Sequence, residues 1–239
     1  MMSDKYSEFY KLRVSDYTRY DTLSIHAILD ILQDIAGKHC INYHMAYDDL
    51  IKNNQIWVLL KIKYEVVKNI GLYETIKATT WPKANKLVDF DRDFLLCDKN
   101  DDVVIKATSQ WVIIDNNTRK IIPAKKVNNN LIAVNENVFA EKLNKLADFT
   151  IDNCNVYKEE AQFMDLDHNG HVNNIKYGVY ILNALSLKSD EKIKAFEINY
   201  INELHYKETI SVYYKKENNT YNIKGMVDDK LIFIAKLDI

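Results

Sequence analysis

The feature that most constrains the fold is an order of predicted elements that occurs twice along the 239 residues. In each copy, one amphipathic helix precedes a run of strands. The first helix is predicted over 22–37, where apolar residues recur at helical spacing and Gly37 offers a stop. Its strands are predicted over 56–67, 74–81, 90–97 and 103–114. A helix followed by antiparallel strands, given twice, predicts an α+β fold of two packed units.

The second copy starts with a helix after His171. Its apolar stripe, expected to face the core, is formed by Val172, Ile175, Val179 and Leu182. Its strands are predicted over 195–201, 208–214, 221–227 and 231–237. Pairs or runs of turn-forming residues separate neighbouring strands at 98–102, Asn218-Asn219 and Asp228-Asp229. Between the copies, residues 123–150 are rich in Lys and Asn with weak periodicity, which indicates a crossing linker.

Composition excludes several classes of protein. With 47% hydrophobic residues the chain can bury one large core or two small ones, and a net charge of −2 gives no basic stripe for nucleic acid. No apolar run approaches the roughly 20 residues that span a bilayer, and the polar start is unlike a signal peptide. Cys40, Cys97 and Cys154 have neither CxxC pairing nor metal-ligand spacing. We therefore expect reduced cysteines, a cytoplasmic location, no metal and no membrane span.

The densest group of reactive side chains lies in residues 165–174, Asp-Leu-Asp-His-Asn-Gly-His-Val-Asn-Asn. Asp167, Asn169 and His171 are spaced by two, and extended backbone sends such residues to one face. A carboxylate can orient or deprotonate, an amide can hold a carbonyl, and an imidazole can do either near neutral pH. Polar residues before an apolar helix are also typical of helix caps, which would account for one or two of the three.

The same segment, with Lys176-Tyr177 just after it, closely resembles the signature of the acyl-acyl carrier protein thioesterases, as a bacterial member. Shorter motifs extend the resemblance over nearly the whole chain: Ile56-Trp-Val-Leu59, Thr80-Trp-Pro82, Arg92-Asp-Phe94 and Ser109 to Asp115. The resemblance implies two tandem hotdog units, each an antiparallel sheet wrapped around a long helix. It places an N-terminal unit at 5–125, a linker at 126–150 and a C-terminal unit at 151–239.

The resemblance also implies a catalytic set of Asp167, Asn169, His171 and Glu203, with Glu203 on the strand after the second helix. In plant members a Cys follows that Glu and was once considered a nucleophile, but here the residue is Leu204. Direct attack by water is therefore favoured. Our first assignment makes Glu203 the general base, and Asp167 is a nearly equal alternative because a sequence gives no distances. His205 is not included in the predicted set.

The implied reaction is hydrolysis of fatty acyl-carrier protein thioesters to free fatty acid, which terminates fatty acid synthesis. Acyl carrier protein is the implied partner, no cofactor is expected, and a homodimer is compatible with the sequence. The N-terminal unit would hold the acyl chain without an active site, with Trp57 as a candidate substrate-binding residue. Two alternatives stay open: an acyl-CoA thioesterase, and a non-catalytic acyl-binding or regulatory hotdog protein.

The first copy serves as an internal comparison. Aligning the two helix starts sets Asp21, Leu23 and Ile25 opposite Asp167, Asn169 and His171. Glu-Thr-Ile occurs at 74–76 and again at 208–210, and this offset of 134 residues (208 − 74) sets Asn69 opposite Glu203. The first copy would then lack the amide, the imidazole and the glutamate, which predicts one active site per chain.

Overall fold

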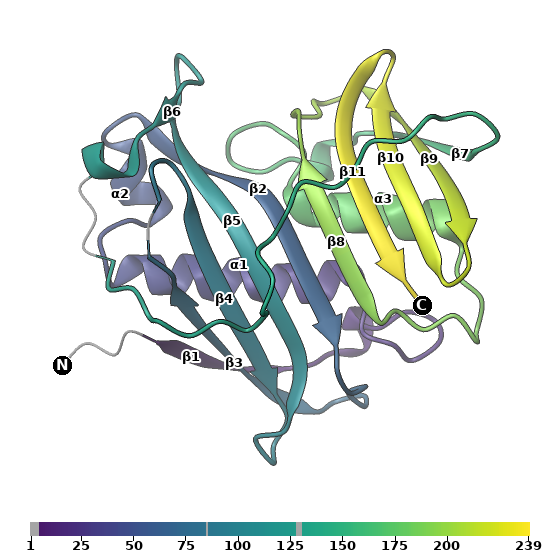
Figure 1. Ribbon diagram of the computed structural model, residues 1–239, viewed down its shortest axis with the longest axis horizontal. Helices are drawn as coiled ribbons and strands as arrows, with labels where there is room; N and C mark the ends of the chain where they lie inside the picture. The colour runs from purple at the N-terminus through teal and green to yellow at the C-terminus, as the bar shows by residue number, and fades with distance from the viewer. Residues whose placement is uncertain (1–4, 85, 128–130) are drawn as a thin grey trace. The chain divides into compact units, whose positions relative to one another are not determined.

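A computed structural model of the chain describes residues 5–84, 86–127 and 131–239. Its packing forms two units (Figure 1), of which unit 1 comprises Met1–Ser15 and Asp30–Leu143 and unit 2 comprises Asp16–Leu29 and Asn144–Ile239. The segment Asp16–Leu29, which we expected in the N-terminal unit, therefore groups with unit 2. In the described part of the chain, no helix combines the length and apolarity needed to cross a membrane.

Unit 1 is built on an antiparallel sheet in the order β1-β3-β4-β5-β2, with a short strand β6 beside β5. The strands are β1 (Tyr6–Lys11), β2 (Gln55–Val66), β3 (Thr75–Pro82), β4 (Phe90–Cys97), β5 (Val103–Asp115) and β6 (Ile121–Ile122). The short helices are η1 (Val14–Asp16), α2 (Tyr47–Ile51) and η2 (Ala124–Lys126). Helix α1 (Ile25–Ile41) reaches this sheet through its second half, where Nδ1 of His39 lies 3.0 Å from Nη1 of Arg92 on β4.

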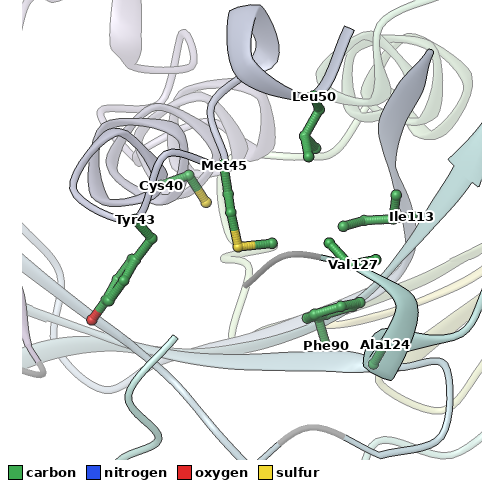
Figure 2. Close-up of a cluster of buried hydrophobic side chains, with 8 residues drawn as sticks. All are labelled: Cys40, Tyr43, Met45, Leu50, Phe90, Ile113, Ala124 and Val127. Atoms are coloured by element: carbon green, nitrogen blue, oxygen red, sulfur yellow. The ribbon is translucent and has the colours of Figure 1, made fainter. Parts of the chain in front are cut away.

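The core of unit 1 contains an apolar cluster between the end of α1 and the sheet (Figure 2). We call it the unit 1 cluster, and it consists of Cys40, Tyr43, Met45, Leu50, Phe90, Ile113, Ala124 and Val127. Helix α1 continues past Gly37 to Ile41 and thereby brings Cys40 into this cluster. The predicted stop at Gly37 is wrong, because burial of the last turn offsets the roughly 1 kcal/mol that a glycine costs inside a helix.

Unit 2 repeats the plan with an antiparallel sheet in the order β8-β11-β10-β9-β7. The strands are β7 (Asn155–Glu160), β8 (Ala195–Tyr200), β9 (Thr209–Glu217), β10 (Thr220–Val227) and β11 (Lys230–Asp238). Helix α3 (Asn174–Leu185) packs on this sheet, with the ring of Tyr177 5.6 Å from that of Phe233 on β11. Of the expected apolar stripe only Val172 is buried, and it lies before the helix, whereas Ile175, Val179 and Leu182 are half-buried. The buried positions of α3 are Tyr177, Gly178, Tyr180, Ile181, Ala184 and Leu185.

All eight predicted strands are confirmed to within three residues at each end, and the three predicted turns lie between the expected strands. The antiparallel α+β architecture is therefore confirmed. Three strands were not predicted, namely β1, β7 and the two-residue β6. The residues of the edge strands β1 and β7 alternate between half-buried and exposed, or are exposed on both faces, so neither of these two strands carries the fully apolar positions that mark a strand in a sequence.

The predicted linker, 126–150, contains no helix or strand in its part described beyond η2, residues 131–150. Buried side chains of each unit nevertheless hold it. In unit 1 the Val138 N–H donates to Oδ2 of Asp93 at 3.0 Å, and in unit 2 the Leu146 N–H donates to Oδ1 of Asn199 at 2.7 Å. Both acceptors are buried, so these bonds are shielded from water and fix the path of the segment.

Gly225 on β10 lies where no side chain fits. A Cβ there would stand 2.2 Å from Cε1 of Phe233 and 2.9 Å from Cδ1 of Ile210, both fully buried. We expect Gly225→Ala to lower the free energy of unfolding by about 1–3 kcal/mol, the usual cost of overpacking. Denaturant unfolding measures this, with Gly37→Ala in α1 as the control.

At Gly37 nothing lies within 4 Å of an added Cβ, so alanine should stabilise the protein by about 1 kcal/mol through helix propensity. An unfolding midpoint unchanged by Gly225→Ala would contradict the close packing described for this strand.

Candidate active site

The Asp167–His171 segment forms a tight turn that leads from η3 (Phe163–Asp165) into α3. The Asp167 N–H donates to the His171 carbonyl at 2.8 Å, and the Gly170 N–H donates to the Asp167 carbonyl at 3.0 Å. Gly170 has a φ of 76°, which glycine adopts without strain. The helix cap is Asn173, whose Oδ1 accepts from the Ile175 N–H at 3.2 Å. Capping therefore falls to a residue outside the predicted triplet.

The carboxylate of Asp167 is occupied by the turn itself. Its Oδ1 accepts from the backbone N–H of Asn169 at 2.8 Å and from that of His171 at 3.3 Å. Its Oδ2 accepts from Nδ2 of Asn169 at 3.4 Å. Asp167 therefore orients the amide of Asn169 and holds the backbone that carries the imidazole of His171.

Glu203 lies beside His171, with Oε2 of the carboxylate 3.4 Å from Nε2 of the imidazole. The two side chains are 37% and 21% exposed, so the pair borders solvent. Strand β8 ends at Tyr200, so the expectation that Glu203 stands on that strand is wrong. Instead it lies in the following loop, which is fixed where the Val172 N–H donates to the carbonyl of the fully buried Leu204 at 2.9 Å. A backbone bond between the two segments thus sets the distance between carboxylate and imidazole.

His205 is a member of the group that the sequence prediction omitted. It pairs with His171 in an isolated antiparallel bridge, and the two imidazole centroids are 5.0 Å apart at an interplanar angle of 71°. The spacing of two between Glu203 and His205 was the signal for it, since extended residues two apart share a face. Ligand atoms of His171, Glu203 and His205 all lie within 4.8 Å of one another, so these residues are placed to hold a metal ion.

Side chains behind the turn fix η3 to α3. Asp165 accepts a hydrogen bond from the Tyr180 hydroxyl at 2.8 Å and lies 3.3 Å from Nζ of Lys176. Burial raises the pKa of Tyr177 and of Tyr180, so both phenols stay protonated at neutral pH. They act as packed donors and are not candidates for a general base.

The surroundings of Cys40 and Cys97 do not favour a cysteine nucleophile at either position. Cys40 is buried in the unit 1 cluster, and burial raises the pKa of its thiol. Burial also raises the pKa of Cys97, with nearby Asp101 adding to the shift. A thiol needs the opposite shift to become a reactive thiolate near pH 7.

Trp57 on β2 packs against the unit 1 cluster. Its indole N–H donates to the carbonyl of Met45 at 2.9 Å, and its ring meets that of Phe90 edge-on at 5.0 Å. The indole therefore has a fixed orientation within the apolar core of unit 1. Its role in substrate binding stays a prediction.

The turn before α1 repeats the turn before α3, but not in the register expected from the sequence. The bridge between Tyr17 and Leu23 matches that between Leu166 and Val172, an offset of 149 residues (172 − 23). The backbone agrees, because Thr18 N–H donates to the Thr22 carbonyl at 2.8 Å as Asp167 does to His171. The alignment of Asp21 with Asp167 is therefore wrong by three residues, and Asp21 instead matches Gly170 in having a positive φ.

In the corrected register the positions of Asp167, Asn169 and His171 are taken by Thr18, Tyr20 and Thr22. The first copy still lacks the amide and the imidazole. The offset of 134 for the later strands is supported by a shared hydrogen-bond pattern. The N–H groups of residues 67 and 68 both donate to the Val104 carbonyl, and those of residues 201 and 202 both donate to the Ile232 carbonyl. Asn69 therefore does stand opposite Glu203.

Comparison with known proteins places this geometry in a family. The model of the acyl-ACP thioesterase N-terminal domain matches residues 3–134, and that of the C-terminal domain matches residues 150–231. The palmitoyl-acyl carrier protein thioesterase of Gossypium hirsutum is 26% identical over 254 residues, covering 98% of this chain and 60% of that protein. The oleoyl-acyl carrier protein thioesterase of Coriandrum sativum is 25% identical over 234 residues, covering 89% and 59%. The chain thus spans about three-fifths of the length of these plant relatives.

Solved structures agree with the fold. An acyl-ACP thioesterase from Bacteroides thetaiotaomicron superposes with a TM-score of 0.89 at 21% identity, covering 98% of this chain and 97% of that one. The 12:0-ACP thioesterase from Umbellularia californica has a TM-score of 0.86 at 19% identity, covering 100% and 98%. The predicted α+β fold of two tandem hotdog units is thereby confirmed. Because the two family models together match residues 3–134 and 150–231, which is most of the chain, the chain belongs to the acyl-ACP thioesterase family.

Proposed function

We propose that this protein hydrolyses fatty acyl-acyl carrier protein thioesters to free fatty acid and carrier protein, and so ends fatty acid synthesis. The observation that carries the proposal is the pairing of His171 with Glu203 at 3.4 Å, next to an amide that Asp167 orients. A thioester carbonyl needs a donor for its developing oxyanion and a base for water. Within one solvent-bordered group, this site supplies both.

In the proposed reaction Glu203 takes a proton from a water molecule whose oxygen attacks the thioester carbon. The carbonyl oxygen becomes an oxyanion, which the Asn169 amide and the His171 imidazole stabilise by donating hydrogen bonds. The oxyanion then re-forms the carbonyl as the carbon–sulfur bond breaks, and the leaving thiolate takes the proton held by Glu203, which restores the carboxylate. The products are a carboxylic acid and the carrier protein with its thiol.

The hydrogen bonds around the two carboxylates support Glu203 over Asp167 as the base. Both oxygens of Asp167 already accept bonds from within the turn. A carboxylate in that position loses those bonds if it takes a proton, whereas Glu203 borders solvent and faces an imidazole. Asp167 then acts as the residue that positions Asn169.

A free-thiol release assay over acyl-carrier substrates of graded chain length tests the proposal. We expect turnover on carrier-linked chains, with kcat/KM higher on carrier protein than on CoA for the same acyl group. A higher value on CoA would favour the acyl-CoA thioesterase alternative. Binding of acyl groups without any thiol release would favour a non-catalytic protein.

We further propose that unit 1 binds the acyl chain beside the partly buried indole of Trp57, which the unit 1 cluster supports from behind and a hydrogen bond to the Met45 carbonyl holds in place. Trp57→Phe is expected to change the ratio of kcat/KM between two chain lengths by about tenfold, the scale at which apolar pockets discriminate methylene groups. Trp81→Phe on β3 is a matched control, because the Trp81 indole also donates to a backbone carbonyl, that of Glu136 at 3.3 Å, and Trp81 is not a member of the unit 1 cluster. Identical chain-length profiles for Trp57→Phe and the wild type would contradict this role.

Cysteine should be dispensable for the reaction. We expect the variant with Cys40, Cys97 and Cys154 all changed to Ser to keep most of its activity wherever it folds, because water is the proposed nucleophile. Circular dichroism controls for folding, since Cys40 is buried. A cysteine-linked acyl group trapped by rapid quench and mass analysis would overturn the water mechanism. The cytoplasmic location and the carrier protein as partner stay predictions.

A further inference from the structure

Two histidines and a glutamate lie close together at the edge of the proposed catalytic group. The donor atoms of His171, Glu203 and His205 lie within 4.8 Å of one another. Only the first two are needed in the proposed reaction. We propose that the three side chains form a binding site for a divalent transition-metal ion, best matched by zinc, and that the bound ion inhibits thioester hydrolysis.

The donor chemistry selects the class of ion. Two imidazole nitrogens and one carboxylate oxygen are a set that zinc takes readily, with a fourth position left for water. Calcium and magnesium prefer shells of oxygen ligands, and two of the three donors here are nitrogen. The set therefore discriminates against the abundant divalent ions of the cell.

The backbone holds two of the three ligands in register. His171 and His205 face each other across an antiparallel bridge, and the neighbouring Val172 N–H donates to the Leu204 carbonyl at 2.9 Å. The bridge fixes the separation of their Cα atoms before any ion arrives. Glu203 stands two residues from His205 along the same extended segment, which directs both side chains to one face.

Only modest rearrangement is needed to close the site. Tetrahedral zinc with nitrogen at about 2.0–2.1 Å brings neighbouring ligand atoms to roughly 3.3 Å from one another. The Nε2 of His171 and Oε2 of Glu203 are already 3.4 Å apart. The imidazole of His205 is exposed, so it can rotate toward the other two without displacing packed atoms.

Charged side chains of both signs surround the three proposed ligands. Glu208 brings a second carboxylate near, because its Oε2 accepts from the His205 N–H at 2.8 Å, and Asp167 stands behind His171. Against these, Nζ of Lys230 donates to the Glu203 carbonyl at 3.0 Å. The Lys230 ammonium is exposed and contacts the backbone of Glu203, not its carboxylate. Solvent therefore weakens its repulsion of a bound cation.

Inhibition follows because the ion would occupy the same two side chains that the reaction uses. A metal bound to His171 and Glu203 removes the imidazole donor from the carbonyl and the carboxylate from water. This part of the inference rests on the proposed function. Metal binding itself does not, and it can be measured without substrate.

The test titrates chelator-dialysed full-length protein with zinc chloride in a calorimeter and, separately, follows thiol release against zinc concentration. The key variant is His205→Ala, with His168→Ala as the control, because His168 is an exposed histidine of the same turn region outside the ligand set. Each variant's rates are expressed relative to its own metal-free rate. Repeating the titration in the triple Cys→Ser variant removes any binding to thiols.

We expect one zinc ion per wild-type chain, no comparable binding of magnesium, and affinity weakened at least tenfold by His205→Ala but unchanged by His168→Ala. The zinc concentration for half-inhibition should rise by the same factor. Wild-type zinc affinity in His205→Ala, or no binding to the wild type, would overturn the site. Zinc binding by a protein that releases no thiol would leave the site standing and reject the proposed function, so the two failures are distinct.

Discussion

Replacing His171 with alanine is expected to lower kcat for thioester hydrolysis by about 10²–10⁴-fold, the range for a lost acid–base or oxyanion group. The imidazole lies beside the Glu203 carboxylate. The backbone N–H of His171 donates to Asp167, which holds the turn in place. Its removal leaves the carbonyl without one donor and the carboxylate without its partner. Asn169→Ala should lose activity on a similar scale, because the second donor to the oxyanion goes.

His168→Ala is the matched control for this prediction. His168 is adjacent in sequence but exposed, and it lies outside the group formed by His171, Glu203 and His205. We expect its kcat to stay within about twofold of the wild type, as is usual for a surface substitution away from a site. In denaturant unfolding, the free energy of unfolding of His171→Ala and of His168→Ala should each stay within about 1 kcal/mol of the wild-type value. Near-normal turnover by folded His171→Ala would reject this site.

Replacing Glu203 with glutamine is expected to cost a similar 10²–10⁴-fold in kcat, with little change in stability. Glutamine keeps the shape of the side chain but cannot accept a proton from water. The side chain is 37% exposed, so its neutralisation leaves no buried charge unpaired. The catalytic loss should therefore appear without a folding defect.

Asp167→Asn is the informative comparison, because the two carboxylates have different surroundings. Asparagine at 167 keeps one oxygen that can accept from the backbone N–H groups of residues 169 and 171. A neutral amide oxygen accepts these hydrogen bonds more weakly than a charged carboxylate does. We expect its activity loss to come with a lower free energy of unfolding, by about 1 kcal/mol. If Asp167→Asn abolishes turnover with unchanged stability while Glu203→Gln stays active, then Asp167 is the base.

Local patterns along the chain determined most of the fold. The turns at 98–102, 218–219 and 228–229 and the eight longer strands with buried residues were readable, because turn-forming residues and apolar alternation act within a few residues. The edge strands β1 and β7 escaped, since edge strands carry polar residues on positions that a central strand would bury. The stop at Gly37 failed for the related reason that packing of Cys40 outweighs a weak local propensity.

Local sequence patterns likewise predicted one part of the candidate site and missed another. Asp167, Asn169 and His171 were visible as one motif because the turn that holds them is local, built from hydrogen bonds between residues at most four apart. The order of the repeats was visible too, and so was the offset of their later strands, but the register of the turn before each helix was not. Counting residues along the sequence does not reveal an alignment error of three residues, whereas the bridge between Tyr17 and Leu23 fixes the alignment.

The family resemblance assigns Glu203 to the site, but only the tertiary structure decided that His205 also meets the motif and which hydrogen bonds each carboxylate makes. Glu203 and His205 are more than thirty positions beyond His171, and the bridge between the two histidines brings them together. The occupation of both Asp167 oxygens by the turn is likewise a matter of distances. A sequence specifies which groups are present, but the balance between orienting a neighbour and activating water depends on hydrogen-bond geometry, which a chain acquires only on folding.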